Sequence, residues 1–246
     1  MVRCTLHTSG LVKIMWNINR DAEVQIHELM GSKIYTIDNF LQQPRKLERF
    51  LFNRNSFPVQ GDPWGMNMKE YVKQRYSDWI DESCPIVAVA QHLCKQAVGK
   101  HGGFETNVEA WRISAYNDIT NNYWFPHIDN GYNCIIYFNN NLTGGTNLYH
   151  PKLKDEKWFQ DLMKEVPLGQ NPWIPKKDVE LLHTLTPRYN RMVLFDGNKF
   201  PHGTAITDES YMYGATQLTT NSLTKFSRRN LCFFFYPEND DNKKES

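Results

Sequence analysis

The chain has 246 residues, a formal net charge of +1 and 13% aromatic residues. A chain of this length can bury a sizeable core in one domain, and its balanced charge disfavours a nucleic-acid partner without excluding a local basic groove. Five cysteines without paired spacing favour reduced thiols in the cytoplasm, and we find neither an apolar run of membrane-spanning length nor a signal-peptide core.

The first 106 residues predict short strands followed by supporting helices. Residues 33–37 are rich in β-formers, and Asp38 then stands in the position of a helix N-cap. Apolar side chains at helical spacing predict two further helices, over 68–80 and 85–98. We expect these helices to pack against a sheet.

From residue 107 the spacing of the apolar residues changes from that of a helix to that of a strand. Strands are predicted at 108–114, 134–138, 191–195 and 231–236. Residues 150–186 are rich in lysine and proline, and 203–227 have no clear period, so both are interpreted as insertions between strands. With a polar tail at 237–246, the chain is predicted to be a single domain whose core spans 107–236.

His127 and Asp129 form the most informative motif. Residues two apart in a strand share a face, so an imidazole and a carboxylate would point the same way. An isolated His-x-Asp pair is also compatible with a surface or capping role. With His202 as a third ligand the set matches that of non-heme Fe(II) oxygenases, whereas zinc prefers four ligands, or three and a water.

Several short motifs follow one another along the chain. In order they are His127-Ile128-Asp129, Gly144-Gly145, Phe195-Asp196-Gly197, His202-Gly203 and Arg228-Arg229-Asn230-Leu231. Their order and spacing resemble the Fe(II)/2-oxoglutarate-dependent oxygenases, specifically the branch that looks like prolyl 4-hydroxylases. Residues 34–41 are similar to the entry strand and helix of that branch, and the resemblance covers roughly residues 34–236.

The resemblance implies an α+β fold, with a double-stranded β-helix (jelly-roll) core and supporting N-terminal helices. It implies that His127, Asp129 and His202 bind Fe(II). The implied reaction uses O2 and 2-oxoglutarate to hydroxylate a substrate, and it releases succinate and CO2. The substrate is a small molecule, a peptide or a protein, with prolyl residues among the candidates. A chloride-dependent halogenation is disfavoured, because Asp129 is not replaced by Ala or Gly.

The resemblance also implies a cation for the distal carboxylate of 2-oxoglutarate. Arg228 takes the arginine place of the family's Arg-x-Ser pattern, and Asn230 stands where Ser is common. Arg229 is the competitor, because strand register decides which side chain points inward. Tyr116 sits where the family often has a tyrosine that hydrogen-bonds the cosubstrate, although a core aromatic would fit the same position.

Two other functional classes remain open on the sequence. One is a non-catalytic jelly-roll module that binds a carbohydrate or a protein. The other is a cupin-like metal enzyme that uses no 2-oxoglutarate. Neither needs a buried cation, so Arg228 separates them from the oxygenase. The sequence leaves the oligomeric state and the substrate open.

Overall fold

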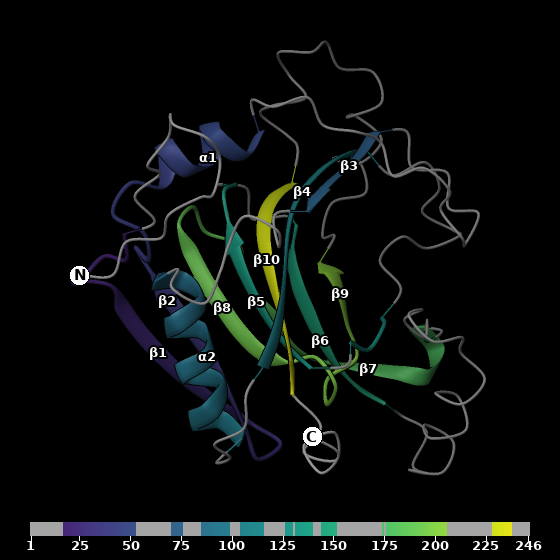
Figure 1. The fold of residues 1–246 in the computed structure, drawn as a ribbon. Helices are drawn as coiled ribbons and strands as arrows, with labels where there is room; N and C mark the ends of the chain where they lie inside the picture. The colour runs from purple at the N-terminus through teal and green to yellow at the C-terminus, as the bar shows by residue number, and fades with distance from the viewer. Residues whose placement is uncertain are drawn as a thin grey trace, which may run out of the picture.

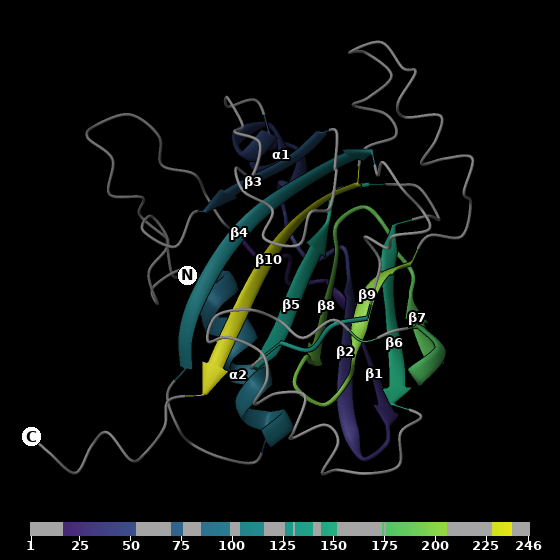
Figure 2. The same cartoon turned by 90° about the vertical axis from the view of Figure 1, so that its right-hand side faces the viewer.

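Two antiparallel sheets form the framework, and two helices lie against the larger one (Figures 1 and 2). The structure is a computed structural model. It describes residues 17–52, 70–75, 85–98, 104–115, 126–129, 131–139, 144–151, 174, 176–205 and 228–237.

The larger sheet has seven strands in the order β1-β2-β8-β5-β10-β4-β3. They are β1 (Glu23–Leu29), β2 (Ser32–Asp38), β3 (Glu70–Arg75), β4 (Phe104–Ala115), β5 (Tyr132–Tyr137), β8 (Arg191–Asp196) and β10 (Arg228–Pro237). The smaller sheet has the order β7-β6-β9, with β6 (Gly145–Pro151), β7 (Val179–Leu185) and β9 (His202–Ala205). The helices are α1 (Pro44–Phe52), α2 (Pro85–Val98) and the 3-10 turn η2 (Lys176–Asp178).

The larger sheet separates two apolar cores. On β5, Cys134 and Ile136 pack towards the helices, whereas Ile135 and Tyr137 point between the two sheets. This alternation is the two-residue period of a strand. The core between the sheets also includes Leu148 of β6, so it is closed by the smaller sheet.

The same alternation sets the two faces of β10. Leu231 and Phe233 belong to the core under the helices, and Cys232 belongs to the core between the sheets. Arg228 and Asn230 therefore share the inner face with Cys232. Arg229 points the other way and forms an ion pair with Glu48 of α1.

Much of the predicted element order is confirmed. The helix expected over 85–98 is α2, and the expected strands correspond to β2, β4, β5, β8 and β10. The helix expected over 68–80 is wrong, because Glu70–Arg75 forms β3 and pairs with β4. Short apolar runs do not distinguish a helix from a strand, and β4 offers β3 the edge opposite β10.

The expected helix cap at Asp38 is also wrong. Asp38 ends β2, and its buried carboxylate forms ion pairs with Arg188 and Arg191. Helix α1 begins only at Pro44, where the missing N–H costs no intrahelical bond. The residue types at 38 fitted a cap, but long-range partners at 188 and 191 decided its role.

The two expected insertions are shorter than the sequence indicated. Residues 179–185 of the first form β7 and pair with β6, and residues 203–205 of the second belong to β9. Segments 152–173 and 206–227 lie outside the described residues, and so do Tyr116 and the tail from 238. The single-domain organisation stays a prediction.

Cys94, Cys134 and Cys232 are buried thiols in the described part of the chain. Burial and the nearby charge of Asp196 raise the pKa of Cys94, which keeps its thiol protonated. Among the described residues, neither helix is long and apolar enough to cross a membrane.

Candidate metal centre

Backbone pairing brings His127 and His202 together. His127 N–H donates to the His202 carbonyl over 2.9 Å, and His202 N–H donates to the His127 carbonyl over 2.8 Å. The two residues form an isolated antiparallel bridge beside β9, and their ring centroids lie 4.4 Å apart. Residues 75 positions apart in the sequence thus present two imidazoles at one point.

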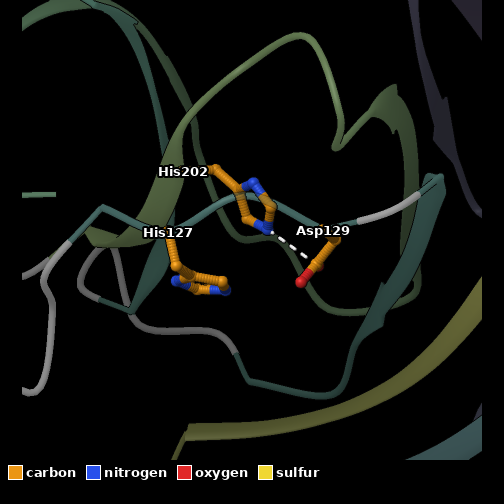
Figure 3. Close-up of side chains that lie close together, drawn as sticks. All are labelled: His127, Asp129 and His202. Atoms are coloured by element: carbon orange, nitrogen blue, oxygen red, sulfur yellow. Dashed lines mark hydrogen bonds and ion pairs between the residues drawn. The ribbon is translucent and has the colours of Figure 1, made fainter. Parts of the chain in front are cut away.

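Asp129 supplies the carboxylate at this point. Its backbone N–H donates to the Gly197 carbonyl over 3.1 Å, which fixes the segment against the turn after β8. The candidate ligand atoms of His127, Asp129 and His202 lie within 4.8 Å of one another, and all three side chains converge (Figure 3). His202 Nε2 and Asp129 Oδ2 are 3.1 Å apart.

The orientation of His202 is fixed by its second ring nitrogen. Nδ1 lies 2.9 Å from the Phe200 carbonyl oxygen, which can only accept, so Nδ1 carries the proton. The ring also stands edge-on to Phe195, with centroids 5.0 Å apart. The lone pair is therefore on Nε2 and points towards Asp129, as in histidine ligands oriented by a carbonyl.

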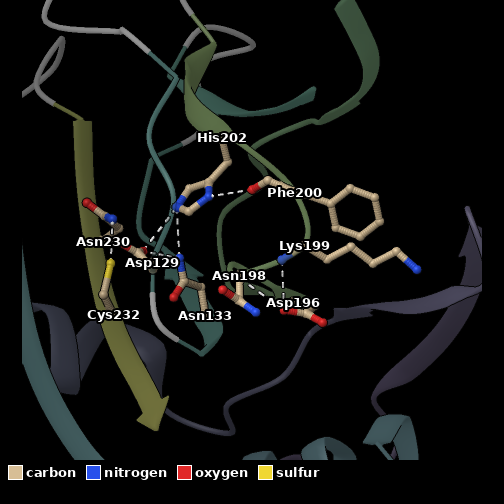
Figure 4. Close-up of polar contacts among 9 residues, drawn as sticks. All are labelled: Asp129, Asn133, Asp196, Asn198, Lys199, Phe200, His202, Asn230 and Cys232. Carbon is tan, nitrogen blue, oxygen red and sulfur yellow. Dashed lines mark hydrogen bonds and ion pairs between the residues drawn. The ribbon is translucent and has the colours of Figure 1, made fainter. Parts of the chain in front are cut away.

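Asn133 lies beside His202 and Asp129 and makes polar contacts with both (Figure 4). Its Nδ2 donates to Asp129 Oδ2 over 2.5 Å and lies 2.9 Å from His202 Nε2. The residue is buried on the inner face of β5, and its Oδ1 has no hydrogen-bond partner within the described ranges. No motif in the sequence pointed to Asn133, although the residue lies four positions after Asp129, immediately before a predicted strand.

The electrostatics of Asp129 favour its ionised form. Burial alone raises the pKa of this carboxyl, because it removes water from the charged form. When they are protonated, the imidazoles of His202 and His127, together with the hydrogen bond from Asn133, outweigh burial and hold the pKa well below its usual range. The site therefore presents a carboxylate beside two imidazoles.

This donor set fits a divalent transition metal. Imidazole nitrogen suits iron, zinc, copper and nickel, and a carboxylate adds the negative charge that a cation needs. The 3.1 Å between His202 Nε2 and Asp129 Oδ2 is close to the separation of about 3.0 Å expected for neighbouring ligands at right angles, with bonds of about 2.1 Å. The Asn133 side chain lies beside these atoms and presents its Nδ2 to them, while its buried Oδ1 is without a hydrogen-bond partner among the described residues.

A second polar group lies on the inner faces of β10, β5 and β6. Arg228 Nε donates to the Gly144 carbonyl over 2.6 Å, and its aliphatic stem packs against Gly144. The Tyr137 hydroxyl lies 2.8 Å from Thr146 Oγ1. Burial raises the pKa of Tyr137, although the positive charge of Arg228 and the Thr146 hydrogen bond act in the opposite direction.

Sequence reasoning missed Tyr137 and Thr146. Tyr137 was seen as part of a strand, and the alternation from Ile135 would have placed it on the inner face. Thr146 needed the pairing of β6 with β9 and β7, which no short motif announces.

The other cosubstrate candidates are distributed over both faces of β10. Asn230 is buried on the inner face, where its Nδ2 donates to Cys232 Sγ over 3.0 Å and its Oδ1 lacks a partner among the described residues. Arg229 lies on the helix side, against Glu48, whose second oxygen accepts from the Tyr189 hydroxyl. The structure therefore brings Arg228 and Asn230, but not Arg229, to the space between the sheets.

Comparison with solved structures reveals relatives in fold. The chain is similar to the non-heme α-ketoglutarate-dependent epimerase SnoN from nogalamycin biosynthesis, with a TM-score of 0.50 and 10% identity over 84% of this chain and 79% of that one. This similarity shows the fold.

Two prolyl 4-hydroxylase structures are also similar. The Pseudomonas putida enzyme gives a TM-score of 0.43 and 14% identity, covering 89% of this chain and 93% of that one. The Phytophthora capsici structure gives 0.44 and 12%, covering 83% of this chain, which spans only 58% of that protein. No protein-family model matches the sequence, and no curated protein matches it.

Proposed function

We propose that the chain is an Fe(II)- and 2-oxoglutarate-dependent dioxygenase that hydroxylates a small-molecule, peptide or protein substrate. The supporting observation is the convergence of His127, Asp129 and His202 beside the space between the sheets, with Arg228 on an inner face of the same space. A binding module would not need a buried carboxylate between two imidazoles. A cupin-like enzyme without 2-oxoglutarate would not need the guanidinium.

The order of the strands supports a double-stranded β-helix for the core. After β4 the chain reaches the bridge at His127 beside β9, returns to the larger sheet as β5, and enters the smaller sheet as β6 and β7. It then alternates through β8, β9 and β10. Antiparallel strands that pass repeatedly between two facing sheets are the hallmark of a jelly roll.

In this proposal the metal is held by His127, Asp129 and His202. Bound iron would supply the chemistry of dioxygen activation coupled to decarboxylation of 2-oxoglutarate. The chain's own contribution is orientation: the Phe200 carbonyl fixes the His202 ring, and the Gly197 carbonyl fixes the backbone of Asp129. Such outer contacts set the direction of a ligand's lone pair.

The polar group around Arg228 would bind the distal carboxylate of 2-oxoglutarate. A guanidinium can donate to both carboxylate oxygens at once, and the Tyr137 hydroxyl beside it offers a further donor. The amide of Asn230 can donate as well, in the place where the resembled family often has a serine hydroxyl. The apolar residues between the sheets lower the local dielectric, which strengthens these contacts.

The direct test is formation of succinate from 2-oxoglutarate by the purified chain with added Fe(II) under air. We expect succinate from the wild type and none from His202→Ala or from a chelator-treated sample. Metal binding without succinate would favour the cupin-like alternative, and absence of both would favour a binding module. A cytoplasmic location stays a prediction from the scattered cysteines of the sequence.

A further inference from the structure

We propose that Asn133 is a fourth protein ligand of the metal centre, through its amide oxygen. This inference rests on the proposed metal site. It adds a residue outside the two-histidine and one-carboxylate set implied by the motifs, and it limits how many positions the metal offers to other molecules.

The first argument is competition for one lone pair. His202 Nδ1 carries the proton, so Nε2 has a single lone pair, and Asn133 Nδ2 lies 2.9 Å from it. A metal ion needs the same lone pair. The amide NH2 group and a metal therefore cannot both use His202, and metal binding requires the amide to turn or to leave.

The second argument is that the amide has little room to leave. A methyl group added at Gly197 would lie 3.0 Å from Asn133 Nδ2 and 3.1 Å from its Cγ, so the side chain packs directly against this glycine. Asn133 is also only 3% exposed. A half-turn about its last side-chain bond exchanges Nδ2 and Oδ1 while the remaining atoms stay in place.

The third argument concerns the distances from the exchanged oxygen to Asp129 and His202, because this oxygen would take the present position of Nδ2. The amide atom now at this place is 2.5 Å from Asp129 Oδ2 and 2.9 Å from His202 Nε2, and these two atoms are 3.1 Å apart. Ligands at right angles around an ion with bonds of about 2.1 Å are separated by about 3.0 Å. The separations of 2.9 and 3.1 Å fit this value, whereas the 2.5 Å contact with Asp129 would have to widen by about 0.5 Å. After that widening an oxygen there would complete one triangular face of a coordination sphere.

The consequence is that the metal offers fewer coordination positions to other molecules. Three protein ligands leave three positions of a six-coordinate ion, whereas four leave two, which a chelating 2-oxoglutarate would fill. A neutral amide is a weak ligand, so a further molecule could displace it. Asn133 would then control access to the last position.

The test uses Mn²⁺ binding to the full-length chain, measured by calorimetry, and electron paramagnetic resonance in water enriched in the magnetic oxygen isotope. We expect Asn133→Leu, which has a similar volume and no polar atom, to weaken Mn²⁺ binding by about 10- to 100-fold. We also expect its ion to carry one more exchangeable water than in the wild type. Cys134→Ser, on the opposite face of β5, is the matched control and should keep both the affinity and the water count.

Two results would overturn the inference. Tighter Mn²⁺ binding by Asn133→Leu would mean that the amide only competes with the metal, and an unchanged water count would mean that it only donates to Asp129. Thermal unfolding of each variant, and the same measurement on the smaller change Asn133→Ala, separate these results from misfolding. If Asp129→Ala and His202→Ala also keep wild-type affinity, the metal centre itself has failed, which is a different outcome.

Discussion

In the described part of the chain two aspartates are almost fully buried, and they differ in the groups that neutralise them. Asp38 is 3% exposed and Asp129 is 5% exposed, and both have a lowered carboxyl pKa. Asp38 accepts from Arg191 through both of its oxygens, at 2.6 and 2.8 Å, and also from Arg188 at 2.8 Å. The groups that lower the pKa of Asp129 are the imidazoles of His202 and His127 and the amide of Asn133.

The difference distinguishes a carboxylate that is neutralised within the chain from one that, in our proposal, binds a metal. A guanidinium always carries its charge, so the Asp38 pocket contains its counter-charge within the chain. An imidazole is a cation only when protonated, and an amide is never one. A divalent ion would therefore add most to the Asp129 pocket, since a buried carboxylate needs a paired charge. The comparison predicts that replacing Asp129 weakens metal binding with little effect on stability, whereas replacing Asp38 lowers stability with little effect on metal binding.

The largest effect is expected from Asp129→Ala. We expect loss of measurable Mn²⁺ binding and of succinate formation, because the anionic ligand is gone, while the thermal midpoint of the chain without added metal stays near that of the wild type. Calorimetry and thermal unfolding check this. A variant that keeps wild-type metal affinity would show that Asp129 is not a ligand.

Asp38→Ala should show the opposite pattern. Removing one partner of a buried ion pair costs about 3–5 kcal/mol, because the other charge stays buried. We expect a decrease of that order in the free energy of unfolding by urea, with Mn²⁺ affinity of the folded protein unchanged. Equal weakening of metal binding by both aspartate variants would remove the distinction between the two pockets.

Arg228→Ala and Arg229→Ala form a matched pair on one strand. We expect Arg228→Ala to raise the half-saturating concentration of 2-oxoglutarate about 30-fold or more, since a carboxylate left without its charged partner loses about 2 kcal/mol or more. Arg229→Ala removes the ion pair with Glu48, and it should lower stability by about 1 kcal/mol without changing that concentration. If only Arg229→Ala raises this concentration, 2-oxoglutarate binds on the face of β10 opposite to the one that we propose.

The smallest effect concerns pH. The folded-state pKa of Asp38 is lowered, first by the hydrogen bond from Arg191, so its stabilisation is fully present above the ordinary aspartate pKa of about 4. It is lost as the pH falls through the lower folded-state value. The free energy of unfolding by urea should therefore decrease between neutral pH and pH 3 in the wild type, and it should decrease less in Asp38→Asn. Parallel curves would exclude this role for Asp38.

The sequence predicted the parts that local patterns encode. Helix α2 follows from its apolar spacing, and β5, β8 and β10 follow from their β-formers. The spacing of His127 and Asp129 suggested a shared direction for their side chains, and the family resemblance added His202; the structure brings the three together although residues 126–129 form only an isolated bridge. The side on which Arg228 lies, by contrast, depended on register, which the sequence left open between two neighbouring arginines.

The parts that were missed depend on long-range partners. The role of Asp38 is set by two arginines about 150 residues away, and no local signal distinguishes it from a helix cap. Likewise β3 needs the open edge of β4, and Asn133 matters only because Gly197 and His202 pack beside it. Such pairings come from tertiary structure, which a pattern read along the chain does not contain.

The most direct test of the account is the binding of 2-oxoglutarate in the absence of oxygen, measured by calorimetry with and without Mn²⁺. If the Asp129 pocket holds the metal and Arg228 holds the distal carboxylate, the metal-loaded wild type should bind one 2-oxoglutarate per chain. Without Mn²⁺, or in Asp129→Ala, the affinity should be at least about 100-fold lower, because chelation is lost. Equal affinity with and without the metal would contradict the account.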